Sequence, residues 1–525
     1  MEKFLKLIYL VISTILLSAC GSPANTTESI SLLDIPGIMN DDLVSEETPF
    51  DLTLEYALEE AIHRREGIGK PNYNILLPIA DERLRLGFEW VEQYGEDYIV
   101  EIITESMIPT LRAKNITSEE AIADAEKLLW LLRINYGAYT YYGGDEVFIS
   151  LFDRIYEELA MQDQWNDLED FSQIFHEYLF EIIADNHVII DNRVLGDGIS
   201  SDFFVGSIGF EKSKRGFRSK ETGLHVIEVI GHDIDQLFRL SANIKGAFEY
   251  LPILIIPGKS ELQSYDITLV YENGDQETMT LKYNDTRRKN FQPIPALTRH
   301  SNIPVINIMK MGFYHDEVTA QKFVDFADEL KDEPVVIIDL RSNEGGNPQL
   351  AMQFLHKLTD EIVPSNLLFI TLGNYEYLMT TYDNVLVDDP HYASIDDFKI
   401  YFCPGAAPLN DVYYLSSNLP DRLLSNEQLI ILLTDRYTAS AGEAFVDLSF
   451  NLTNSLVIGQ NTAGVLEKSG THASFYLPNS GVEIRFGSSL ILHADGTFAE
   501  GIGYAPDIWA TGDALSTALA LLNNK

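Results

Sequence analysis

The sequence predicts an α-helical domain, then a β-rich insert, then an α/β core with helices packed on a sheet. Three observations predict this order. Apolar residues recur at helical spacing from about 50 to 185, strand-like runs fill 195–295, and strands alternate with helices from 303 onward. A chain of 525 residues is long enough for such domains to have substantial cores. We place the three parts at 49–190, 195–295 and 300–525.

Residues 1–20 have the pattern of a bacterial lipoprotein signal peptide. Lys3 and Lys6 precede the apolar run Leu7–Leu17, which is too short to span a bilayer comfortably, and Leu17-Ser-Ala-Cys20 closes it. We expect cleavage before Cys20, a lipid on its thiol, and attachment to the extracytoplasmic face of the cell membrane. A plain secretory signal and an uncleaved anchor are the alternatives. The polar residues 21–48 predict a flexible tether.

The charge of the chain excludes some classes of partner. A formal net charge of −43, from 80 acidic and 37 basic residues, argues against nucleic acid and against an anionic membrane surface. The two cysteines, Cys20 and Cys403, provide no disulfide framework, and Cys403 is expected to be a small buried apolar residue. No set of His, Cys and carboxylate residues has metal-ligand spacing, so we expect neither metal nor cofactor.

The helical domain is predicted from four amphipathic stretches, near 52–61, 121–132, 148–159 and 171–183. The tyrosine-rich segment Tyr136–Gly144 lies between two of them. It either lines a substrate groove or packs two helices together. The domain ends at Asp185-Asn-His187, where a helix gives way to a strand-like run. His187 is either structural or presented there to a neighbouring domain.

The β-rich insert is predicted from alternating runs at 224–230, 250–256, 266–271 and 278–283. The segment Glu272-Asn-Gly-Asp275 has the composition of a hairpin turn between the last two runs. The insert contains no clear glycine loop of the kind that binds a carboxylate.

The α/β domain is predicted from strands that alternate with helices. The expected strands are 304–309, 335–340, 428–434 and 456–459, the expected helices are 318–330, 348–358, 441–452 and 514–522, and 473–477 with 482–486 form a hairpin.

Two strand-to-helix turns in this domain have the chemistry of an anion site. Ser440 begins a helix whose first N–H groups lack partners and carry partial positive charge, so an oxyanion beside it would meet them. Ser440 with Glu443 also fits a capping box, which is the structural alternative. At the other turn, Gly345 and Gly346 allow backbone N–H groups to face a ligand closely.

Four motifs occur in a fixed order: Asp339–Gly346, Thr438–Glu443, Gly459–Gly464 and Glu500–Asp507. Together, over about residues 300–510, they resemble the core of the C-terminal processing (tail-specific) serine peptidases. The resemblance implies a crotonase-like ββα-type sheet with packed helices for the catalytic core. It also implies a PDZ-like domain at the place of the β-rich insert, which many relatives carry there.

The resemblance offers two kinds of catalytic machinery. In a Ser/Lys dyad the lysine directly follows a Gly-x-x-Thr-x-Gly motif, but here Val465 follows Gly464, and Lys468 could substitute only if the loop bends. The tricorn-like and chlamydial-protease-like branch uses serine, an upstream histidine and a late glutamate. By resemblance, Ser440 is the nucleophile, His187 the general base and Glu500 its orienting partner.

The remaining site residues follow from the same resemblance. The Ala441 N–H, with that of Gly345 or Gly346, would form the oxyanion hole. His472, His493 and His315 compete with His187 for the role of base, while Asp339 and Arg341 are expected to brace the glycine turn.

The sequence therefore predicts a lipid-anchored extracytoplasmic serine endopeptidase that cleaves polypeptides through an acyl-enzyme. The alternatives are a catalytically inactive surface protein that keeps the fold and binds peptides, and an acyl hydrolase that acts on small esters.

Overall fold

The computed structural model describes residues 49–66, 93–94, 102–103, 105–195, 201–258, 261–284, 294–311, 317–372, 413–416, 423–466, 473–487, 489–493 and 500–523. The predicted signal peptide with Cys20, the tether, Cys403, His315, Lys468 and His472 lie outside these residues. Among the helices that are described, none is both long and apolar enough to cross a membrane.

One sheet of 14 strands runs through the α/β domain and the insert. Its centre is parallel and mostly apolar, as expected for strands that are buried on both faces. The strands of the α/β part, in sheet order, are β13 (Ala296–His300), β14 (Ile303–Asn307), β15 (Val335–Asp339), β18 (Leu429–Thr434), β19 (Ser455–Gly459) and β23 (Ile508–Ala510).

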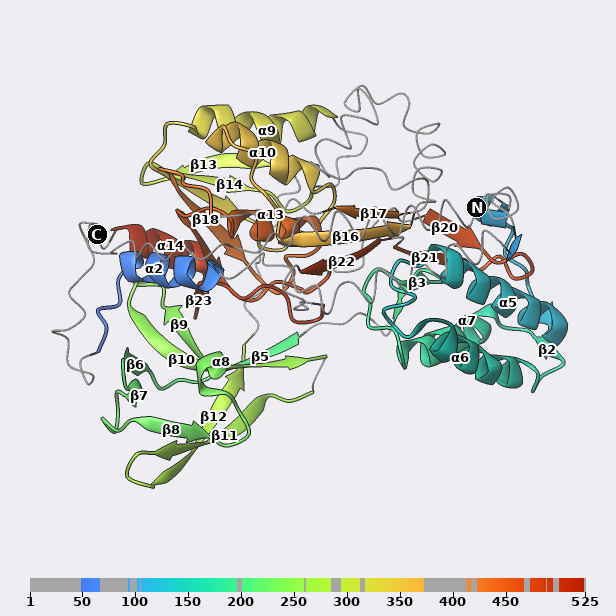
Figure 1. The fold of residues 1–525 in the computed structure, drawn as a ribbon, viewed down its shortest axis with the longest axis horizontal. Helices are drawn as coiled ribbons and strands as arrows, with labels where there is room; N and C mark the ends of the chain where they lie inside the picture. The colour runs from blue at the N-terminus through green and yellow to red at the C-terminus, as the bar shows by residue number, and fades with distance from the viewer. Residues whose placement is uncertain are drawn as a thin grey trace, which may run out of the picture. The chain divides into compact units, whose positions relative to one another are not determined.

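Helices cover both faces of this central sheet (Figure 1). One face carries α9 (Glu317–Leu330), α10 (Gln349–Thr359) and α13 (Ala441–Ser449). The other carries α14 (Ala514–Asn523) and α2 (Leu54–Arg65). The alternation of strands and helices predicted for this domain is confirmed, with ends that differ by a few residues.

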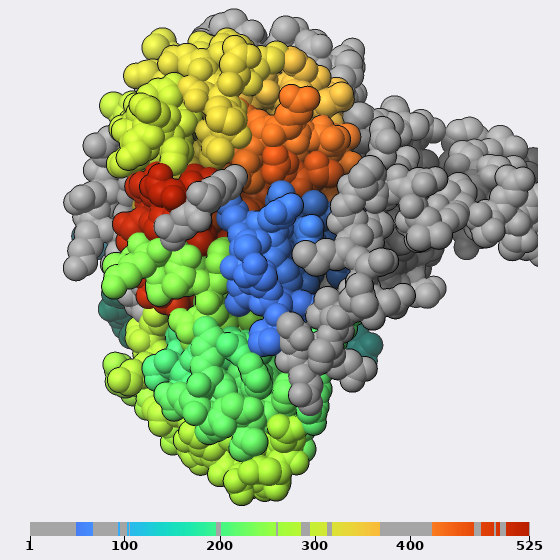
Figure 2. Space-filling view, turned by 90° about the vertical axis from the view of Figure 1, so that its left-hand side faces the viewer, coloured from blue at the N-terminus to red at the C-terminus, as the bar shows by residue number. Residues whose placement is uncertain are grey.

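The position of α2 corrects one prediction. We grouped residues 52–61 with the helical domain, but Ala57 and Ala61 pack into the core on the sheet. Arg65 is buried, donates to the Ser455 carbonyl oxygen at 3.0 Å and pairs with the Asp507 carboxylate. Figure 2 shows α2 in blue between the orange and red segments of the core and the green insert. A helical pattern gives the buried face but not its partner.

The segment predicted to be β-rich consists mainly of strands, and these continue the central sheet, because β9 pairs in parallel with β23. The hairpin turn is also confirmed, since the Gly274 N–H donates to the Tyr271 carbonyl oxygen at 2.8 Å. The elements are β5 (Ser201–Val205), β6 (Phe210–Ser213), β7 (Gly216–Ser219), β8 (Val226–Val229), α8 (Ile234–Leu237), β9 (Phe238–Ala242), β10 (Phe248–Pro257), β11 (Ser264–Tyr271) and β12 (Gln276–Tyr283).

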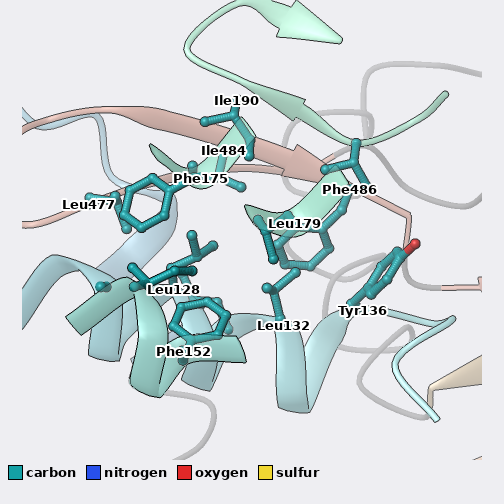
Figure 3. Close-up of a cluster of buried hydrophobic side chains, with 14 of the residues drawn as sticks. Leu128, Leu132, Tyr136, Phe152, Phe175, Leu179, Ile190, Leu477, Ile484 and Phe486 are labelled. Atoms are coloured by element: carbon teal, nitrogen blue, oxygen red, sulfur yellow. The ribbon is translucent and has the colours of Figure 1, made fainter. Parts of the chain in front are cut away.

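Three of the predicted helices form a separate core with the predicted hairpin of β20 (Ala473–Tyr476) and β21 (Glu483–Phe486). These helices are α5 (Ser118–Asn135), α6 (Gly144–Leu159) and α7 (Leu168–Phe180). Figure 3 shows Leu128, Leu132 and Phe175 facing Ile484 and Phe486 in this core. Helical and catalytic parts of the chain are therefore joined by a shared hydrophobic cluster.

Short strands complete this junction. Directly after His187, β3 (Ile189–Ile190) pairs with β21, with Ile190 opposite Ile484. This pairing fixes the segment that carries His187 against the core. The remaining strands of the described residues are β1 (Ile116–Thr117), β2 (Gln164–Trp165), β4 (Arg193–Val194), β16 (Leu367–Leu372), β17 (Tyr413–Ser416) and β22 (Ser489–His493).

Truncation of Phe486 should weaken the packing of the helices on the hairpin of β20 and β21. Its side chain is 1% exposed, stacks on Phe475 at 5.0 Å and meets the Tyr136 ring edge-on at 5.7 Å. Phe486→Ala should lower the free energy of unfolding by about 3–5 kcal/mol, which denaturant titration measures. The control Phe180→Ala removes a ring that is 47% exposed and should change it by less than about 0.5 kcal/mol. Equal losses in both variants would contradict the described packing.

Candidate active site

The turn between β18 and α13 holds Ser440 in a strained backbone conformation. Its φ is 50° and its ψ −116°, whereas the helix caps Thr53 and Thr117 have the extended values that caps ordinarily adopt. Such a conformation is costly for a residue with a side chain and persists where the surroundings enforce it. A strained serine on a sharp strand-to-helix turn is the arrangement that exposes a nucleophilic hydroxyl. A helix cap does not need this backbone conformation, so capping alone does not explain the φ and ψ of Ser440.

The surroundings that enforce this turn centre on Glu443, whose side chain is fully buried. Its Oε2 accepts the Ser440 N–H at 3.0 Å and the Val465 N–H at 2.7 Å. Its Oε1 accepts the Thr462 hydroxyl at 2.6 Å and the Gly464 N–H at 2.8 Å. Burial raises the pKa of this carboxyl, and the four donors oppose that rise. Glu443 thus joins the serine turn to the Gly459–Gly464 motif.

The glycine turn lies directly against Ser440. Gly345 has a φ of +90°, and a Cβ on it would come within 2.6 Å of the Ser440 Cβ and 3.2 Å of the Ala441 nitrogen. Only glycine can therefore approach the serine this closely without displacing it.

The orientation of the N–H groups at this turn separates the two predicted oxyanion donors. The Gly345 N–H donates to the Asn343 Oδ1 at 2.8 Å and is engaged. Within the described part of the chain, neither the Ala441 N–H nor the Gly346 N–H donates a hydrogen bond. The structure thus favours Ala441 with Gly346 as the pair that can meet an oxyanion.

Asp339 and Arg341 brace the turn, as predicted. The Arg341 guanidinium donates to both oxygens of Asp339 at 2.8 Å and to Asp513 at 2.6 Å. On the other side, the Ser342 N–H donates to the buried Asp435 at 2.9 Å. These ion pairs hold the turn and leave no proton-transfer role for its charged residues.

His187 and Glu500 are brought together, with Asp185 beside them. One side-chain atom from each of these three residues, a ring nitrogen or a carboxylate oxygen, lies within 4.8 Å of the others. The His187 Nδ1 is 3.7 Å from the Asp185 Oδ1, and the Asn186 N–H donates to the Glu500 Oε1 at 3.4 Å. Metal ions also bind such groups, but the Asp185 carboxylate already accepts the backbone N–H of His187 at 2.7 Å and the Tyr136 hydroxyl at 2.6 Å. We therefore interpret the cluster as a proton-transfer site.

Three carboxylates act on the pKa of the His187 imidazole. Burial lowers its pKa, but Asp185 first, and then Glu500 and Glu443, raise it, and the net pKa is above the ordinary 6.5. Glu443, which contributes the last of these effects, lies in the first turn of the Ser440 helix.

The loop that carries Glu500 is fixed to the same network as Ser440. The Gly501 N–H donates to the Gly464 carbonyl oxygen at 2.8 Å. Thr462, which donates to Glu443, also accepts the Tyr504 N–H on its hydroxyl at 2.7 Å. One continuous set of hydrogen bonds therefore links the Glu500 loop, the Gly459–Gly464 motif and the Ser440 turn.

Sequence reasoning missed the second layer of groups around His187. The Tyr136 hydroxyl donates to Asp185, and the Tyr142 hydroxyl donates to the Ala184 carbonyl oxygen at 2.6 Å. The tyrosine segment also packs helices, as one of the two alternatives stated, because Tyr139 stacks on Phe148 at 4.4 Å. The tyrosine cluster and the Asp-x-His pattern were visible in the sequence, but nothing there showed that they meet.

The other candidates for the base, His493 and the residue at the position of a dyad lysine, lie in different surroundings. His493 is buried edge-on against Tyr504 at 5.2 Å, near Asp447, whose carboxylate accepts the Ser365 hydroxyl at 2.7 Å. It thus lies between Tyr504 and the buried Asp447 cluster. At the position where a dyad would have its lysine, Val465 contributes its N–H to Glu443.

Comparison with known proteins agrees with this site. Residues 302–510 match the model of peptidase family S41. The strained serine turn and the family match define a hydrolase of the serine peptidase class. The match covers the α/β region alone, which is similar to peptidase family S41.

Solved structures give weaker likenesses. Mature CPAF in complex with lactacystin is 15% identical with a TM-score of 0.41, over 78% of this chain and 99% of that one. The photosystem II D1 C-terminal processing protease is 12% identical with a TM-score of 0.36, over 78% and 97%. A lipoprotein from Streptococcus agalactiae is 13% identical with a TM-score of 0.35, over 78% and 97%. No curated protein matches.

Adding a methyl group at Gly345 should displace Ser440. Gly345→Ala should slow the reaction of Ser440 with a fluorophosphonate at least about 100-fold, because misplacement of a nucleophile by about 1 Å has effects of that size. The control is Gly274→Ala, since Gly274 has a φ of +87° with no atom within 4 Å of an added Cβ. Both variants carry the same backbone strain, but only the first should lose reactivity. Equal reactivity in both would show that Gly345 does not position Ser440.

Proposed function

We propose that this protein is a serine endopeptidase that cleaves polypeptides through a Ser440, His187 and Glu500 triad, as in the tricorn-like and chlamydial-protease-like branch. The observation that carries the proposal is the strained Ser440 turn in one hydrogen-bonded network with the Glu500 loop. The convergence of His187 with Glu500 supports it.

In the proposed mechanism, neutral His187 takes the proton of the Ser440 hydroxyl as its oxygen attacks the substrate carbonyl. The negative oxygen that forms is met by the N–H groups of Ala441 and Gly346, at the positively polarised start of α13. His187 then gives its proton to the leaving amine, which departs and leaves an acyl group on Ser440. Water, activated by the same histidine, hydrolyses this ester and restores the enzyme.

We also propose that the mature protein is lipid-anchored through Cys20 on the extracytoplasmic face of the membrane. The motif Leu17-Ser-Ala-Cys20 after a short apolar run supports this location. Polypeptides exposed on that side of the membrane would then be the substrates.

Replacement of the nucleophile tests the catalytic proposal. Wild-type protein, residues 21–525, should cleave an unfolded polypeptide at internal bonds, and mass spectrometry of the fragments would identify them. Ser440→Ala should lose at least about 1,000-fold in rate at unchanged thermal stability. Full cleavage by Ser440→Ala would refute the triad. Absence of cleavage by the wild type, with peptide binding retained in both, would favour the inactive binding protein. Preference for short esters would favour the acyl hydrolase.

The rate should depend on pH through His187. Only the neutral imidazole accepts a proton, so kcat/KM should fall as the pH drops through the pKa of His187, which is raised above 6.5. In Glu500→Gln one carboxylate that raises this pKa is absent, so the acidic limb should move to lower pH. A limb at or below pH 6.5 in the wild type, or one that Glu500→Gln leaves in place, would be inconsistent with this assignment.

The anchor is tested by partition into detergent. Full-length protein expressed in a bacterium should enter the detergent phase and incorporate a labelled fatty acid. Cys20→Ser should do neither, because the thiol that accepts the lipid is absent. Equal labelling of both proteins would exclude Cys20 as the lipid site.

A further inference from the structure

We propose that Asp185, held by the Tyr136 hydroxyl, is the residue that orients the His187 imidazole, so that this peptidase has a second carboxylate beside Glu500. The inference rests on the proposed function and deepens it. Asp185 is a positioning residue here, because it acts through His187 and does not touch the substrate.

The geometry places Asp185 at the Nδ1 side of the imidazole. Its Oδ1 accepts the backbone N–H of His187 at 2.7 Å and lies 3.7 Å from the ring Nδ1. This separation is longer than a hydrogen bond, and catalytic contacts are commonly longer before the substrate binds. With its proton on Nδ1 facing Asp185, the neutral imidazole has its lone pair on Nε2, which is the atom that must accept the Ser440 proton.

Burial distinguishes the two carboxylates. Asp185 is 0% exposed, whereas Glu500 is only partly buried. Because a buried charge is screened less, it acts more strongly on a neighbouring imidazole than a solvated one does. The effect of Asp185 on the pKa of His187 accordingly exceeds the effect of Glu500. Both carboxylates therefore act on the imidazole, and Asp185 is the more deeply buried of the two.

Tyr136 connects this carboxylate to the core of the helical domain. Its ring is fully buried at the end of α5 and packs edge-on against Phe486, while its hydroxyl donates to the Asp185 Oδ2 at 2.6 Å. Figure 3 shows Tyr136 at the edge of the cluster, with its oxygen pointing away from the packed side chains. Burial raises the pKa of this phenol, so it remains a donor. The packing of the helices therefore fixes the position of Asp185.

Three variants test the inference. Asp185→Asn should lower kcat by about 100-fold to 10,000-fold with little change in KM, as expected when a histidine loses the group that sets its tautomer. Tyr136→Phe removes one oxygen and keeps the ring, and should lower kcat about 10-fold. The matched control is Tyr139→Phe, since the Tyr139 hydroxyl donates to Asp145 at 3.0 Å in the same segment. Its kcat should stay within about twofold of the wild type.

The pH profile separates positioning from a general structural effect. The acidic limb of kcat/KM should move to lower pH in Asp185→Asn, and further than in Glu500→Gln, whereas Tyr139→Phe should leave it in place. If kcat of Asp185→Asn stays within a few-fold of the wild type, or if Tyr136→Phe equals Tyr139→Phe, the inference is wrong. If Asp185→Asn does not fold, the comparison of kcat between Tyr136→Phe and Tyr139→Phe decides whether the inference holds. Activity that survives Ser440→Ala would instead refute the proposed function itself.

Discussion

The buried carboxylate of Glu443 is the contact on which the candidate site depends. It accepts hydrogen bonds from Ser440, Thr462, Gly464 and Val465, which belong to two separate motifs. A serine in a strained turn needs surroundings that fix it, and an inward-facing charge needs several donors to remain stable. Here the serine turn supplies a donor to the buried carboxylate, and the carboxylate in turn fixes the serine turn. The Val465 side chain, at the position of a dyad lysine, cannot accept a proton, and its backbone N–H serves the network.

The histidine comes from a different part of the chain, and its position depends on packing. The segment after Asp185 joins the core through β3 and β21, and the helices bury their apolar faces on the same hairpin. The structure therefore combines two kinds of constraint. Hydrogen bonds fix the serine turn and the Glu500 loop, while a hydrophobic cluster and two tyrosine hydroxyls hold the segment with His187.

The insert contacts both sides of the site through polar groups. Arg436, just before Ser440, donates to the Ser201 carbonyl oxygen at 2.6 Å and to Asp202 at 3.1 Å. The hydroxyl of Ser201 donates to the carbonyl oxygen of Gly501, next to Glu500. One end of β5 thus touches the serine turn and the acid loop together, which couples the insert mechanically to both.

Much of the fold was predictable because its signals are local. The apolar runs 335–339 and 429–433 predict buried parallel strands without knowledge of their neighbours, and the hairpins follow from turn residues. The order of the four motifs predicted Ser440 and Glu500 as candidate site residues. Contacts between distant segments were not predictable. The bond between Tyr136 and Asp185, the packing of α2 on the sheet, and the engagement of the Gly345 N–H all depend on the folded chain.

The most direct test of the account is the intact mass of residues 21–525 after treatment with a fluorophosphonate, alongside Ser440→Ala and His187→Ala. The account predicts one adduct on the wild type, none on Ser440→Ala, and a reaction slowed at least about 100-fold in His187→Ala. An adduct that persists at the wild-type rate in His187→Ala would assign the base to another residue. A wild-type protein without any adduct, in its native folded state, would contradict the claim that this turn activates a serine.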